Sequence, residues 1–150
     1  MTYDVAIVGT GGISHEHGTA YRNLDSCRLV ACADIDADRA ATFAEEYGVP
    51  EAGVFEDHRA MLDAVAPDIV GVCTPPSAHA DPVVDSARAG VRAIHCEKPM
   101  ADTFGDARLM AQEARRNGVQ LTFNHENRFA DPVVRARDLF EAGDIGAIRR

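Results

Sequence analysis

The stretch YDVAIVGTGGIS, residues 3–14, decides the fold that the sequence predicts. Its first six residues predict a short buried strand, and the glycine-rich turn after them leads into a predicted helix. Backbone N–H groups at such a junction can bind a dinucleotide diphosphate, because the positive end of the helix dipole lies behind them. Gly9 would permit the tight turn, and Gly11 would leave room for the phosphates. Ser14 stands where the usual G-x-G-x-x-G pattern has its third glycine, and it is small enough for close helix–strand packing.

Length, charge and cysteine content exclude several classes of protein. A chain of 150 residues has room for one domain and the beginning of another. Its net charge of −9 argues against nucleic acid or an anionic membrane as a partner. No apolar run approaches the roughly 18 residues that span a bilayer, and the N-terminus lacks the features of a signal peptide. Four cysteines without C-x-x-C spacing predict reduced, mostly buried thiols, no metal site and a cytoplasmic protein.

Predicted strands and helices alternate along the chain. This alternation, with short loops, is typical of βαβ units and predicts an α/β, Rossmann-type doubly wound parallel sheet. We expect the dinucleotide-binding domain to span residues 1–123. Residues 124–150 then form a linker and the first helix of a second α/β domain, with a strand opening at residues 145–150. Strands are expected at residues 3–8, 28–33, 54–55, 68–73, 91–96 and 119–123, and helices at 14–24, 37–47, 57–67, 78–89, 104–117 and 131–142.

Asp34 ends the second predicted strand, where a Rossmann unit carries the acid that binds the adenosine ribose. A carboxylate there accepts hydrogen bonds from both ribose hydroxyls and repels a 2′-phosphate. The sequence therefore favours NAD over NADP, although Arg39 is close enough to keep NADP open. The simpler alternative is that Asp34 is only a solvated loop residue or a helix cap.

These motifs resemble the Gfo/Idh/MocA oxidoreductases, the relatives of glucose–fructose oxidoreductase and inositol dehydrogenase. The resemblance covers nearly the whole chain in the right order. The shared segments are Gly9-x-Gly11-x-Ile13-Ser14-x-x-His17, Val30 to Asp34, Val72-Cys73-Thr74-Pro75-Pro76-x-x-His79, Ala89-Gly90, Cys96-Glu97-Lys98-Pro99 and Asn127-Arg128-Phe129. The Glu-Lys-Pro segment at the end of the fifth long strand is the most specific of them.

Lys98 is the residue expected to carry the chemistry. Residues 74–79 and 97–99 leave the carboxyl ends of strands, where ligands bind to open parallel sheets. The only lysine of the chain, partly desolvated at that edge, could polarise a substrate hydroxyl during hydride transfer. The alternative is an exposed surface lysine. A cis peptide before Pro99 would be one way to direct Lys98 into the cleft.

The remaining cofactor residues follow from the motif and from the resemblance. The resemblance implies that Glu97 bonds the nicotinamide ribose and that His17 and His79 lie near the dinucleotide, although both histidines could equally be structural. Arg128 could contact the substrate or the nicotinamide side. We read His15, His58 and His95 as incidental. The expected cofactor residues are Gly9, Gly11, Gly12, Ile13, Ser14, Asp34, Thr74, Pro75, His79, Glu97, Lys98 and Arg128.

The resemblance also implies what the whole protein does. Its family moves a hydride between nicotinamide and a sugar, polyol or related hydroxy compound. It uses a second domain that binds substrate and supports homo-oligomers. We therefore expect residues 1–150 to be part of a longer NAD-dependent oxidoreductase, to bind NAD and to turn over little alone. Alternatives are a redox-neutral glycosidase that needs NAD, a non-catalytic regulator that senses the dinucleotide, and an imine- or biliverdin-type reductase.

Overall fold

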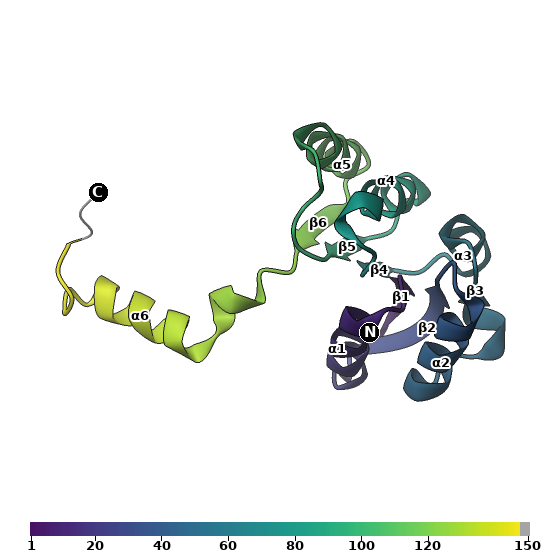
Figure 1. The fold of residues 1–150 in the computed structure, drawn as a ribbon, viewed down its shortest axis with the longest axis horizontal. Coiled ribbons are helices and arrows are strands. Elements are labelled where there is room, and N and C mark those ends of the chain that lie inside the picture. The colour runs from purple at the N-terminus through teal and green to yellow at the C-terminus, as the bar shows by residue number, and fades with distance from the viewer. Residues whose placement is uncertain (148–150) are drawn as a thin grey trace.

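One parallel sheet of six strands organises the computed structural model, which describes residues 1–147 (Figure 1). Its strand order is β3-β2-β1-β4-β5-β6, so the chain reverses direction across the sheet between β1 and β4. This is the Rossmann order, and it confirms the predicted fold class. The strands are β1 (Tyr3–Val8), β2 (Cys27–Ala33), β3 (Val54–Phe55), β4 (Ile69–Val72), β5 (Ala93–Cys96) and β6 (Gln120–Phe123).

Helices cover both faces of the sheet and close two hydrophobic cores. Alternate residues of a strand point to opposite faces, and β1 supplies Ala6 and Val8 to one core and Val5 and Ile7 to the other. Helices α3, α4 and α5 cover the first core, and α1 and α2 cover the second. The helices are α1 (Gly12–Arg22), α2 (Ala37–Tyr47), α3 (His58–Val65), α4 (Ala80–Ala89), α5 (Phe104–Arg116) and α6 (Asp131–Glu141).

Local capping chemistry explains most of the helix boundaries. Asp36, Asp57 and Thr103 each accept a hydrogen bond from a backbone N–H in the first turn of α2, α3 and α5. Gly48 and Gly90 end α2 and α4 in the left-handed conformation that glycine adopts readily. Three short 3₁₀ helices complete the list: η1 (Glu51–Gly53), η2 (Pro76–Ala78) and η3 (Glu126–Phe129).

Two predicted helix starts were wrong by two residues. Helix α1 begins at Gly12 and not at Ser14, because Gly11 serves as its N-cap without any side-chain hydrogen bond. Helix α4 begins at Ala80 and not at residue 78, because the Pro76 turn first forms the separate helix η2. Prolines favour such an opening turn because their φ angle is already close to the helical value.

The segment after β6 leaves the sheet. In Figure 1, η3 and α6 extend away from the body formed by the six strands. Helix α6 has no buried residue along its described length, and Val133 and Phe140 are exposed. The expected strand opening at residues 145–150 is wrong for Ile145, Gly146 and Ala147, which form a turn and a loop. Its last part, residues 148–150, lies outside the described residues.

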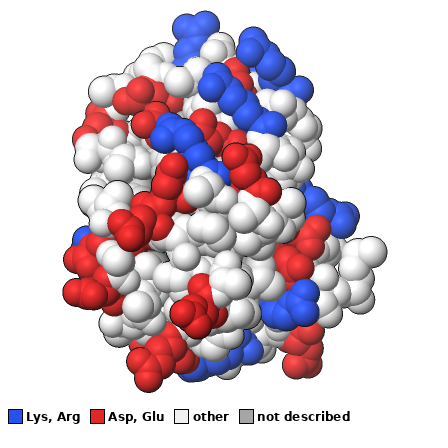
Figure 2. Space-filling view, turned by 90° about the vertical axis from the view of Figure 1, so that its right-hand side faces the viewer, with Lys and Arg blue, Asp and Glu red and all other residues white. Residues whose placement is uncertain are grey.

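The surface is acidic and the thiols are free. In Figure 2 acidic side chains form separate groups spread across the face, with basic ones among them and at its upper edge. All four cysteines are unpaired, and three of them are buried, namely Cys32, Cys73 and Cys96. This confirms that the thiols are mostly buried, as predicted. None of the helices in residues 1–147 is long and apolar enough to cross a membrane.

Candidate functional site

Gly9 holds β1 tightly against the loop that follows β4. Its φ of +85° lies in the region that disfavours side chains. A Cβ at this position would lie only 2.8 Å from the Cys73 carbonyl carbon and 2.8 Å from the Thr74 backbone nitrogen. Both conformation and space therefore require glycine, and the requirement is internal to the fold.

Gly11 and Gly12 face open space instead. A Cβ added to either glycine would meet no atom within 4 Å. Gly11 is the N-cap of α1 and Gly12 its first residue, so the free N–H groups of the helix start here. The fold itself does not need glycine at these positions, and the clear space in front of helix donors fits a diphosphate.

A cavity of about 630 Å³ opens at this edge of the sheet. Its volume is in the range of small-molecule and cofactor sites. It lies at the carboxyl ends of β1, β2 and β4, where the strand order reverses, which is the usual ligand position in such sheets. Seven of the predicted cofactor residues line it: Gly9, Gly11, Gly12, Ile13, Asp34, Thr74 and Pro75.

Asp34 is fixed at one end of this cavity. Its Oδ2 accepts hydrogen bonds from the Thr10 N–H at 2.7 Å and from the Thr10 hydroxyl at 3.2 Å. Its Oδ1 accepts the Asp36 N–H at 2.9 Å. Burial alone would raise the pKa of Asp34, but these hydrogen bonds and the nearby Arg39 outweigh it and hold the pKa below its usual value. The side chain is thus an ionised, pre-positioned acceptor.

A second polar cluster is buried beyond β5. The Glu97 carboxylate accepts hydrogen bonds from His17 Nε2 at 2.7 Å, Asn124 Nδ2 at 2.6 Å and the Lys98 N–H at 3.1 Å. Only 4% of Glu97 is exposed. Burial is the largest single influence on the Glu97 pKa and raises it, yet the three hydrogen bonds together bring it below its usual value. Residues from α1, from the end of β5 and from the end of β6 therefore all bond to the Glu97 carboxylate.

His95 completes this cluster from the side. Its ring centroid lies 5.3 Å from that of His17, and its Nδ1 is 2.9 Å from the Thr122 hydroxyl. Burial first, and the neighbouring His17 second, lower the pKa of His95. His95 was predicted to be incidental; the structure places its ring beside His17, and its role stays a prediction.

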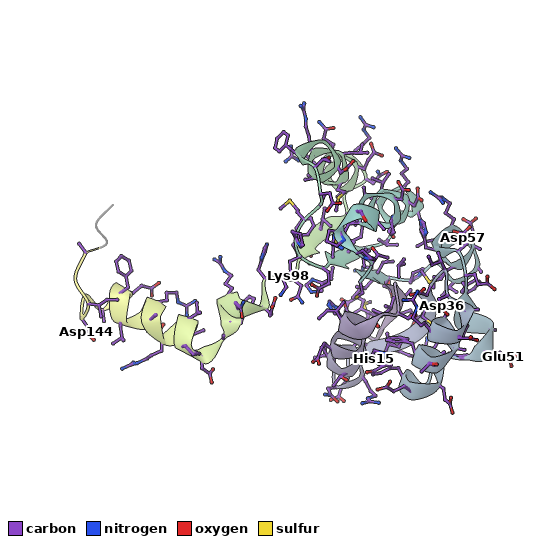
Figure 3. The ribbon with its side chains drawn as sticks, in the orientation of Figure 1. His15, Asp36, Glu51, Asp57, Lys98 and Asp144 are labelled. Carbon is purple, nitrogen blue, oxygen red and sulfur yellow. The ribbon has the colours of Figure 1, made fainter. Side chains whose placement is uncertain are left out.

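Lys98 lies beside the segment that leads to α6, away from Asp36 at the start of α2 (Figure 3). Its Nζ donates to the Glu126 carboxylate, and both side chains are about half exposed. The hydrogen bond to Glu126 raises the pKa of Lys98. Lys98 thus keeps about half of its side chain exposed, and its desolvation in a substrate site stays a prediction. The Lys98–Pro99 peptide is cis.

The other predicted site residues hold the loops of the site or lie on its surface. Ser14 is fully buried, and its hydroxyl donates to the Gly11 carbonyl. His79 is also fully buried, with Nε2 2.8 Å from the Thr74 carbonyl and Nδ1 3.3 Å from the Met100 carbonyl. It joins the loop after β4 to the segment after Pro99. Arg128 is exposed in η3 and does not line the cavity.

Sequence reasoning missed three residues of the site. Thr10 is an unspecified position of the glycine motif, yet it holds Asp34. His58 was read as incidental, but it lines the cavity and its Nε2 lies 2.9 Å from Asp85 Oδ2. Glu126 pairs with Lys98 from 28 positions away. Only Thr10 carried a local signal, namely a hydroxyl in the turn opposite the strand that ends in Asp34.

Metal-binding side chains are dispersed. Within residues 1–147, His, Cys, Asp and Glu residues form no group of three or more that could hold an ion.

Known proteins resemble the chain over almost its whole length. The model of the Gfo/Idh/MocA family, an oxidoreductase family with an NAD-binding Rossmann fold, matches residues 3–125. D-glucoside 3-dehydrogenase of Escherichia coli is 37% identical over 145 residues, which are 96% of this chain and 40% of that protein. D-apiose dehydrogenase of Paraburkholderia graminis is 37% identical over 131 residues, or 87% of this chain and 34% of the relative.

Solved structures give the same result. Scyllo-inositol dehydrogenase from Lactobacillus casei, crystallised with NAD(H) and scyllo-inositol, superposes with a TM-score of 0.90 and 25% identity. The superposition covers 99% of this chain and 43% of that one. The chain thus spans about two fifths of the length of these relatives. It belongs to the Gfo/Idh/MocA oxidoreductase family and carries the NAD-binding Rossmann domain of that family.

Proposed function

We propose that this chain is the cofactor-binding part of an NAD-dependent dehydrogenase that acts on a sugar or polyol. The observation that carries the proposal is the cavity at the ends of β1, β2 and β4, which joins the open glycine turn to the ionised Asp34. The relatives support this substrate class, since they include glucoside, apiose and inositol dehydrogenases. The four free thiols suit a reducing, cytoplasmic location.

The residues of the cavity fit the two halves of the adenosine diphosphate group. Gly11 and Gly12 would receive the phosphates on helix N–H groups, since nothing fills the space in front of them. Asp34 would accept the ribose hydroxyls, because its carboxylate is ionised and already oriented by Thr10. Thr74 and Pro75 would line the path toward the nicotinamide end.

Lys98 would act as the acid or base toward the substrate oxygen. Bound NAD supplies the acceptor or donor of a hydride. The raised pKa keeps Lys98 protonated, so that it donates a hydrogen bond to a substrate oxygen and polarises a carbonyl during reduction. In the oxidative direction Lys98 must first lose a proton to solvent, which its half-exposed side chain contacts, because the lowered pKa of Glu126 makes that carboxylate a poor proton acceptor. Glu97, His17 and Asn124 act as positioning residues because they fix the backbone N–H of Lys98.

Binding of NADH to purified residues 1–150 tests the cofactor half of the proposal. Isothermal titration should detect a single site. Asp34→Asn should weaken it by about tenfold, since one charge-assisted hydrogen-bond acceptor for the ribose is lost. Asp25→Asn is the matched control, because Asp25 is exposed and lies outside the cavity lining. Absence of NADH binding by the parent chain, or equal effects of the two substitutions, would contradict the proposal.

The catalytic half is tested on the longest natural protein that contains this chain. Lys98→Met should abolish NAD-dependent turnover of sugars and polyols while NADH affinity stays within about twofold. Retained turnover in that variant would remove Lys98 from the mechanism.

A further inference from the structure

Two residues of the segment after β6 bond to two adjacent residues at the end of β5. Asn124 Nδ2 donates to the Glu97 carboxylate at 2.6 Å, and the Glu126 carboxylate accepts a hydrogen bond from Lys98 Nζ. Strands β5 and β6 pair in parallel up to the residues just before these, so the side chains continue the pairing beyond the backbone hydrogen bonds. Glu126 is thus brought to Lys98 by the register of the sheet and by the turn of η3.

Lys98 is held at both ends. Its backbone N–H donates to Glu97 Oε2 at 3.1 Å, and its Nζ donates to Glu126. A lysine side chain is long and flexible, and fixing it costs much conformational entropy. The contacts at its two ends remove part of this freedom before any ligand binds. Within residues 1–147 Glu126 uses one of the three N–H donors of the ammonium, which leaves two for the oxygen atoms of a substrate or cofactor.

The stability of the fold does not explain the pair of Lys98 and Glu126. Both side chains are about half exposed. Such an ion pair adds little to the free energy of unfolding, because water and salt screen it. Its main effect therefore falls on Lys98 itself. The charged groups that act on this ammonium in the described part of the chain are Glu126 from η3 and the adjacent Glu97, and both favour the protonated form.

We propose that Glu126 is a positioning residue for Lys98 in hydride transfer, and that its carboxylate holds the ammonium in one orientation between turnovers. When a carbonyl is reduced, Lys98 gives a proton to the oxygen while the carbon takes up the hydride of NADH, and a neutral amine is left. Glu126 then favours the return of a proton from solvent, because its charge stabilises the ammonium. The inference rests on the proposed function and adds a residue that lies outside the glycine and Glu-Lys-Pro motifs.

The test is the pH dependence of turnover in the longest natural protein that contains this chain. Glu126→Gln keeps the size and an acceptor oxygen but removes the charge. We expect kcat to fall by about tenfold, because Lys98 is less well oriented. The pH midpoint that Lys98 sets should move to lower pH, because Glu126 no longer raises its pKa. The dissociation constant for NADH should stay within about twofold, since Glu126 does not line the cofactor cavity.

Two further variants are the matched controls. Glu126→Asp restores a carboxylate near Lys98, so its pH midpoint should lie closer to that of the unchanged protein than to that of Glu126→Gln. Asp102 is an exposed acid that closely follows Lys98 in the sequence, but within residues 1–147 it forms no ion pair with Lys98. Asp102→Asn should therefore leave both kcat and the pH midpoint unchanged.

An unchanged kcat or an unchanged pH midpoint in Glu126→Gln would overturn the inference. Equal effects of Asp102→Asn would do the same, as would a midpoint of Glu126→Asp that stays with that of Glu126→Gln. The variant Lys98→Met separates this inference from the function on which it rests. If Lys98→Met abolishes turnover while Glu126→Gln has no effect, only the role of Glu126 fails; if Lys98→Met retains turnover, the proposed role of Lys98 fails with it.

Discussion

Two glycines of the same turn should respond differently to substitution by alanine: Gly9→Ala should lower the stability of the fold, and Gly11→Ala should weaken NADH binding. At Gly9 the added methyl meets backbone atoms at 2.8 Å, and the φ of +85° is strained for alanine. The conformational cost is about 1–2 kcal/mol, and overpacking adds about 1–3 kcal/mol. The midpoint of the summed cost, about 3.5 kcal/mol, should lower Tm by about 7–14 °C. Gly9→Ala therefore tests the fold.

Gly11→Ala tests the binding of the cofactor. Its φ of −73° is ordinary for alanine and nothing lies within 4 Å of the new methyl, so the loss of stability should stay below about 1 kcal/mol. The methyl points into the proposed phosphate space, and NADH affinity should fall by about tenfold or more. Thermal melts and NADH titrations at 10–15 °C, where both variants are folded, separate the effects. A wild-type Tm for Gly9→Ala, or wild-type NADH affinity for Gly11→Ala, would refute the reasoning.

Three other outcomes follow from the buried groups and from Lys98. Cys27 should react first with a thiol reagent, because burial raises the pKa values of the other three thiols. Those three thiols should react only as fast as the protein unfolds. Stability should fall as the pH drops below about 6.5, since the folded state resists protonation of His95. It should fall again below about 4.5, where the unfolded state protonates Glu97 first. Thermal melts against pH measure both steps, and Glu97→Gln should make the second step smaller, with Asp34 supplying part of what remains. Glu126→Gln should lower the pKa of Lys98 and so speed its acylation at pH 8–9. Mass spectrometry can follow this acylation because the sequence has only one lysine. An unchanged rate would contradict the pairing of Lys98 with Glu126.

Strands and caps were predictable because their causes are local. The strand at residues 3–8 is marked by an apolar run before a glycine turn, and Asp36 marks the start of α2 by its own side chain. Helix α1 was misplaced because Gly11 caps it with backbone alone, which leaves no side-chain signal.

The site was predictable where it follows the ends of strands and not where distant side chains meet. Seven expected residues line the cavity because parallel strands bring their carboxyl ends to one edge. The Glu126 contact with Lys98 and the His58 contact with Asp85 join segments 28 and 27 positions apart. Such pairings depend on how helices pack and on where η3 directs the chain, and no spacing rule in one sequence encodes them.

The first strand synthesised is one of the two central strands of the sheet. β1 pairs with β2 on one side and with β4 on the other, so its second edge stays open until residues 69–72 have been synthesised. A nascent chain that ends before β4 would expose an apolar edge strand, which invites aggregation. Because Gly9 packs against Cys73 and Thr74, the same event closes the floor of the cofactor cavity. NAD can thus bind only after the two halves of the sheet have joined, and its binding energy then favours chains that have completed this step over those that have not.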